Sequence, residues 1–132
     1  MTFDSARPRY KLPFDGKDYE LTGELSVIEA IETAMQRGIL DIAVNIVGMG
    51  LTDTAKLLTT ILNACNHSFT HKTVAAAIFN MGLGSKAFAT LQLHLYSFIA
   101  IILQPPDSRE KKAQEMAAML NHSRGESTSS SA

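Results

Sequence analysis

The sequence predicts a mainly α-helical fold, in which an N-terminal β-hairpin precedes a bundle of five to six short helices around a central apolar helix at 87–103. Three observations predict it. An Asp-Gly dipeptide separates two alternating segments near the N-terminus. Apolar residues then recur at helical spacing from Ser26 onward. The longest apolar segment, AFATLQLHLYSFIAIIL, is apolar on every side in its second half, so other elements must enclose it.

Composition indicates one folded domain and no nucleic-acid ligand. The chain has 132 residues, of which 45% are hydrophobic and 19% charged, and domains commonly contain about 100–150 residues. Because the net charge is −1, no basic field favours nucleic acid. The single cysteine, Cys65, cannot form an intramolecular disulfide, and the first nine residues contain no apolar signal-peptide core. We therefore expect a reducing compartment.

The hairpin and the helical core are predicted together at 10–104, after a flexible leader at 1–9. Asp15-Gly16 suits a type I′ turn because both residue types accept a positive φ. Pairing around this turn places apolar residues opposite each other on one face, Tyr10 with Leu21 and Leu12 with Tyr19. A lone hairpin is marginally stable in water, so this one should pack on the helices or add its free edge to a second copy or another protein.

Helix boundaries follow from capping residues and helix breakers. The first helix should begin at a Ser26–Glu29 capping box and end near Gly38, with Leu25, Ile28, Ile31 and Met35 inward. Further segments are expected at Ile39–Val47, from Thr52 or Asp53 to about Asn66 with Leu58, Ile61, Leu62 and Cys65 inward, and from Thr70 to Met81. Ser85 should cap the central helix, and Pro105-Pro106 should end it.

A membrane span is not expected. The central run is interrupted by Thr90, Gln92, His94 and Ser97, whereas a span needs about 18 or more consecutive apolar residues. After the central helix, a C-terminal helix is predicted at 105–122, with Asp107 as its cap. The serine-rich segment 123–132 has nothing to bury and is predicted to be disordered.

No group of residues predicts catalysis or a resident cofactor. Cys65, His67 and His71 are close in sequence, but their spacing fits no zinc motif and a fourth ligand is missing. The glycine-rich turn at 82–86 follows a helix and lacks the spacing of a phosphate-binding loop. His94 is expected to be a hydrogen-bonded core histidine, because no partner for acid–base chemistry can be named. We therefore predict a protein that is not an enzyme and that holds no metal.

The C-terminal helix has two interpretations. Met116 and Met119 lie beside Leu120 on one face, and methionine suits surfaces that meet varied apolar partners. Either this narrow stripe folds back on the domain, or it docks into a partner as a helix in a groove. In the second case Met116, Met119 and Leu120 are the predicted partner-binding residues.

The order of hairpin and helix resembles a known family. GKDYELT followed directly by ELSVIEAIETA, and then by brief helices to Leu103, is similar to the tail assembly chaperones of long-tailed phages, especially the gene transfer agent and phage tail type. The resemblance implies a non-enzymatic factor in the host cell cytoplasm. Its partners would be apolar helical segments of a tape measure protein, which it covers, and tail tube subunits, which it helps to recruit.

Two other function classes stay open at this point. The first is a structural protein of a phage particle, such as a tail or head-tail connector subunit that forms a ring. The second is a small metal-dependent or ligand-binding enzyme built on Cys65, His67 and His71, which would need those three side chains to converge.

Overall fold

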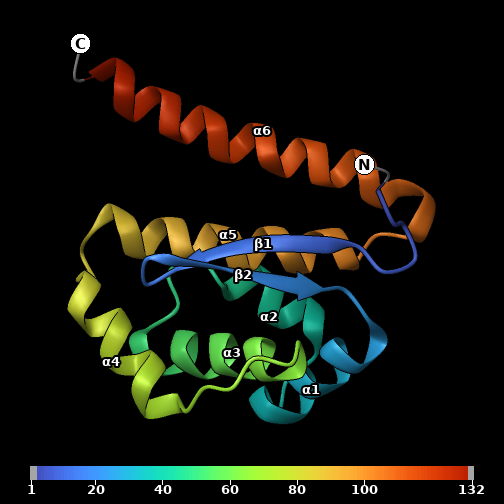
Figure 1. Cartoon of the computed structure of the whole chain (residues 1–132), viewed down its shortest axis with the longest axis horizontal. Coiled ribbons are helices and arrows are strands. Elements are labelled where there is room, and N and C mark those ends of the chain that lie inside the picture. Colours follow the sequence, from blue (N-terminus) through green and yellow to red (C-terminus); the bar gives the residue numbers. More distant parts are fainter. Residues whose placement is uncertain (1–2, 131–132) are drawn as a thin grey trace.

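The predicted fold class is confirmed by the structure, a computed structural model that describes residues 3–130, with side chains described from 3 to 122. In the described chain an antiparallel hairpin precedes six helices, and α6 lies above α5 and the hairpin in the view of Figure 1. The elements are β1 Arg9–Phe14, β2 Lys17–Thr22, α1 Leu25–Met35, α2 Ile39–Asn45, α3 Leu51–Ala64, α4 His71–Met81, α5 Lys86–Ile102 and α6 Pro106–Ser130.

The hairpin has the predicted turn and register. Asp15 and Gly16 have φ values of 52° and 81°, as a type I′ turn requires. Tyr10 pairs with Leu21, and Leu12 pairs with Tyr19. Leu12 and Leu21 are fully buried, because β1 packs on α5 and β2 packs on α3. The hairpin therefore gains its stability by covering the helical core.

Helix α5 is the centre of the fold. Almost every residue of its second half is buried, including Phe98, Ile99 and Ala100. A second layer consists of α1, α3 and α4, which pack in that order beside one another. The inward face of α3 is fully buried at Leu57, Leu58, Ile61 and Leu62, whereas Cys65 is half-buried at its end. No helix in the described part of the chain is both long and apolar enough to cross a membrane.

Two of the predicted helix caps are confirmed. The hydroxyl oxygen of Thr70 accepts a hydrogen bond from the Thr73 amide at 3.2 Å, and that of Ser85 accepts one from the Phe88 amide at 3.2 Å. In both cases the side chain satisfies an amide that has no partner within its helix.

The predicted start of the first helix is wrong. Ser26 already lies in the first turn of α1, so it cannot cap the helix, and the N-cap is Glu24 without a side-chain hydrogen bond. Val27 and Ile31 face the core, while Leu25 is 74% exposed, because residues four apart share a helix face and Leu25 lies on the other side. The helix ends at Gln36, which has a left-handed φ of 54°, before Gly38 is reached.

The other boundary corrections concern the starts of α3 and α6. Gly50, rather than Thr52 or Asp53, is the N-cap of α3. Helix α6 begins at Pro106, the first helical position, where the missing amide hydrogen costs nothing. It continues to Ser130, into the segment predicted to be disordered, because a helix once formed adds one backbone hydrogen bond per residue. Residues 131 and 132 of that segment lie outside the described range.

Candidate partner-binding surfaces

The predicted docking helix is folded back on the domain. Met116 is 9% exposed and lies in a small apolar cluster with Ala100 and Ile101 of α5. Met119 packs against the same cluster, and Leu120 is half-buried. Of the two interpretations of this stripe, the structure shows the intramolecular one. A partner-binding role for Met116, Met119 and Leu120 stays a prediction, and it requires α6 to leave α5.

An exposed apolar stripe lies instead on α2 and the turn after it. Leu40, Val44 and Val47 are 69%, 78% and 61% exposed. Their spacing of four and three residues places them on one side of the helix, opposite Ile42 and Ile46, which are buried in the core. Apart from Asp41 and Asn45 this segment is apolar, and the sequence does not identify which residues face outward, because both sides carry aliphatic residues. This stripe is the part of the described surface best suited to an apolar partner.

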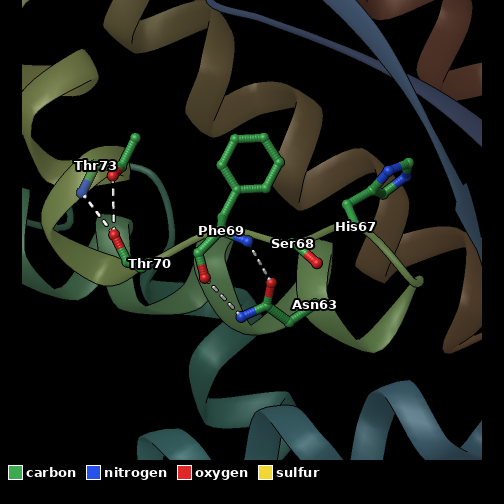
Figure 2. Close-up of a pocket in the computed structure, with 6 residues that line it drawn as sticks. All are labelled: Asn63, His67, Ser68, Phe69, Thr70 and Thr73. Atoms are coloured by element: carbon green, nitrogen blue, oxygen red, sulfur yellow. Dashed lines mark hydrogen bonds between the residues drawn. The ribbon is translucent and has the colours of Figure 1, made fainter.

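A surface hollow of about 590 Å³ lies along the connection between α3 and α4. Figure 2 shows the residues that line it, Asn63, His67, Ser68, Phe69, Thr70 and Thr73. The Asn63 side chain accepts from the Phe69 amide at 2.9 Å and donates to the Phe69 carbonyl at 3.0 Å. These hydrogen bonds fix the turn, so the polar groups that line the hollow are engaged in holding its shape.

A second hollow, of about 450 Å³, lies between the hairpin turn and the start of α5. Its walls are mainly apolar, with Pro13 and Phe14 on one side and Met81, Ala87 and Leu91 on the other. Lys86 and His94 also line it.

His94 is the core histidine that the sequence predicts. It is 8% exposed, and its Nδ1 forms a 2.8 Å hydrogen bond with the hydroxyl of Tyr10 on β1. The two rings also meet edge to face at 5.9 Å. Burial raises the pKa of Tyr10 to about 12, against an opposing hydrogen bond with Ser97. The pair thus attaches the hairpin to the central helix.

Stability should fall at high pH because of Tyr10. Its pKa is about 10 when unfolded and about 12 when folded, so the folded state keeps a proton that the unfolded state loses. The stabilisation that the protonated Tyr10 provides is complete below pH 10 and is lost as the pH rises from 10 towards 12. In urea unfolding, the stabilities of the wild type and of Tyr10→Phe should therefore converge and then cross over this range. The variant should be about 1 kcal/mol less stable at pH 8, since it lacks the hydrogen bond; parallel pH profiles would contradict this account.

Cys65, His67 and His71 do not converge on one point. Cys65 Sγ lies 3.8 Å from the Thr22 carbonyl oxygen, His67 Nε2 lies 2.8 Å from that of Glu20, and His71 Nε2 lies 3.4 Å from that of Thr52. Among the residues that the structure describes, no group of three or more His, Cys, Asp or Glu side chains is placed to hold a metal. Burial also raises the pKa of the Cys65 thiol, which disfavours the thiolate that metals and electrophiles require.

Each edge of the hairpin contains a residue that hinders strand addition. The Gly23 amide donates to the Pro8 carbonyl at 2.7 Å, and hydrogen-bonded pairs alternate along an antiparallel ladder. The backbone groups of Glu20 therefore point outward from β2, where His67 engages the carbonyl. On β1 the outward positions include Pro13, which has no amide hydrogen to offer. A partner is thus better accommodated on a helix surface than on the hairpin.

Comparison with protein-family models, curated proteins and solved structures gives no significant match.

Proposed function

We propose that this protein is a non-enzymatic tail assembly chaperone, which acts in the host cell cytoplasm, covers apolar helical segments of a phage tape measure protein and helps to recruit tail tube subunits. The observation that supports the proposal is the exposed stripe of Leu40, Val44 and Val47. A long helical partner with an apolar face cannot bury that face alone, and a complementary helix surface can cover it.

The size of the stripe indicates how such binding would work. Burying one aliphatic side chain contributes about 1.5–3 kcal/mol, so three of them contribute about 4.5–9 kcal/mol. This gain at best roughly offsets the cost of association, which is about 4–15 kcal/mol. One copy on one short segment should therefore bind weakly. A tape measure protein offers many segments in series, so several copies bound along it gain from their high local concentration. Weak binding by each copy also allows its release when tube subunits arrive.

Polar groups beside the stripe can fix the orientation of a partner helix. Arg37 and Asp41 form an ion pair at 2.8 Å, in which both side chains are partly exposed. Asn45 donates to the Asp41 carbonyl at 2.8 Å. These polar residues border Leu40 and Val44 on α2, which gives the surface an apolar centre and a polar rim, as protein interfaces commonly have.

Co-expression with a tape measure protein tests the proposal. The wild type should keep that protein soluble and co-elute with it, whereas Leu40→Asp with Val44→Asp should lower the yield of complex at least tenfold, since two buried carboxylates would lack partners. Phe79→Asp is the matched control, because Phe79 is 67% exposed on α4 and should leave binding unchanged. Melting temperatures should agree among all three proteins.

Two results would reject the proposal. One is a tape measure protein whose solubility does not respond to the wild type and with which no complex elutes. The other is the presence of the chain in purified particles at a ring stoichiometry, which would identify a structural tail or head-tail connector subunit, because an assembly chaperone should be missing there.

A further inference from the structure

Helix α6 is held by an apolar cluster of its own, separate from the main core. The cluster contains Ala100 and Ile101 of α5 and Met116 of α6. Met116 is the one buried side chain among those described on α6. The partly buried residues around it are Phe3, Tyr10, Tyr96, Ala113 and Met119. The buried members of the main core include no residue of α6, and Tyr10 and Tyr96 pack against both clusters.

The connection and course of α6 also favour its release. Pro105 ends the connection and Pro106 begins α6, and neither has an amide hydrogen with which to bond to α5. Only three residues, 103–105, separate the end of α5 from the start of α6. Figure 1 shows that α6 diverges from α5 towards its C-terminal end. Contact with the domain is therefore concentrated in the first part of this 25-residue helix.

Arg109 fastens the beginning of α6 to two other segments. Its Nη1 donates to the carbonyls of Ser5 at 2.8 Å and Ala6 at 3.3 Å. Its Nε and Nη2 donate to the carbonyls of Gln104 at 2.9 Å and Ile102 at 3.2 Å. A guanidinium with several such bonds is a strong anchor. The Ser5 and Ala6 carbonyls lie far from the connection in sequence, so a second copy of the chain offers them in the same arrangement.

We propose that the α5 face formed by Tyr96, Ala100 and Ile101 is an exchangeable helix-binding surface, and that its second occupant is α6 of another copy. The resident α6 shows which helix fits this surface, and a second copy supplies an identical one. In a symmetric exchange the other copy supplies the α5 face that packs on Met116 and the Ser5 and Ala6 carbonyls that accept from Arg109. Only the bond to Gln104, which lies in the connection itself, depends on how that connection rearranges. A short connection between two helices favours such swapping. Exchange needs no other protein, so it stands apart from the tail-assembly proposal.

Light scattering on the unmodified chain over a wide concentration range tests first whether dimers form. A dimer fraction should rise with concentration, and dimers should persist for minutes after dilution because α6 must detach before they separate. Met116→Asp should abolish the dimer, since the carboxylate disrupts the cluster in either arrangement, whereas Leu40→Asp should leave it intact. A chain that stays monomeric throughout overturns the proposal, and so does a dimer that Leu40→Asp removes and Met116→Asp does not.

Mixing of tagged and untagged dimers measures the exchange itself. Mixed dimers should accumulate slowly for the wild type. They should form about tenfold faster or more for Arg109→Ala, which loses several charge-assisted hydrogen bonds before α6 is released. Lys112→Ala is the control, because the ion pair of Lys112, with Glu115 at 3.8 Å, lies within α6 itself. Equal mixing rates for Arg109→Ala and Lys112→Ala would show that Arg109 does not restrain α6 and would overturn the mechanism.

Discussion

Replacement of Gly23 by alanine is expected to destabilise the protein by about 1–3 kcal/mol, the usual cost of overpacking. Gly23 follows the hairpin and is buried against the end of the central helix. A Cβ added there would overlap Ile102 Cγ2 and would lie 2.9 Å from Pro8 Cγ. The amide of Gly23 also donates to the Pro8 carbonyl at 2.7 Å, so the backbone has little freedom to move away. The clash must therefore be relieved by shifting the Ile102 or Pro8 side chain against its packed neighbours.

Gly84→Ala is the matched control for this effect. A Cβ at Gly84 would meet no atom within 4 Å, and the residue does not adopt the left-handed φ found at Gly82. Its stability should stay within about 0.5 kcal/mol of the wild type. Urea unfolding of the three proteins compares them directly. Equal urea midpoints for Gly23→Ala and Gly84→Ala would contradict this account, because they would show that the end of α5 accommodates the added Cβ with no loss of stability.

The features that the sequence predicts well are those decided by neighbouring residues. The hairpin turn depends on Asp15 and Gly16 alone, and its register follows from their position. The caps at Thr70 and Ser85 bond to amides three residues away. The burial of α5 follows from its length and composition, because a helix that is apolar on all sides must be covered.

The features that the sequence does not predict depend on residues far apart in the chain. Arg109 has an ordinary polar position on its helix, yet it bonds to the Ser5 carbonyl, 104 residues away. The outward direction of Leu40 and Val44 is set by how α2 packs on α5, since aliphatic residues occupy both of its sides. His67 can be assigned to the edge of β2 only when the α3–α4 connection is placed beside the hairpin. Local patterns therefore predict elements, while surfaces require the assembled fold.

The destabilisation expected for Gln92→Leu is about 2–4 kcal/mol, because buried polar groups lose their partners. Gln92 interrupts the apolar run of α5 and is 3% exposed. Its amide donates to the Met49 carbonyl at 2.8 Å and to Thr54 Oγ1 at 3.2 Å. Its carbonyl oxygen accepts from the Gly48 amide at 3.1 Å. One side chain thus secures the whole turn between α2 and α3, which contains no regular backbone hydrogen-bond ladder of its own.

A double-mutant cycle with Thr54→Val tests whether the loss arises from this network. Removing both partners should cost less than the sum of the two single changes, by about 1 kcal/mol, because each single change leaves the other group buried without its partner. Gln114→Leu, at an exposed position of α6, should change the free energy of unfolding by less than about 0.5 kcal/mol. Strictly additive losses would show that Gln92 stabilises the turn by packing alone. If the losses are coupled, the hydrogen bonds of Gln92 also hold the end of α2 in place. They would then fix the direction in which Leu40 and Val44 face a partner.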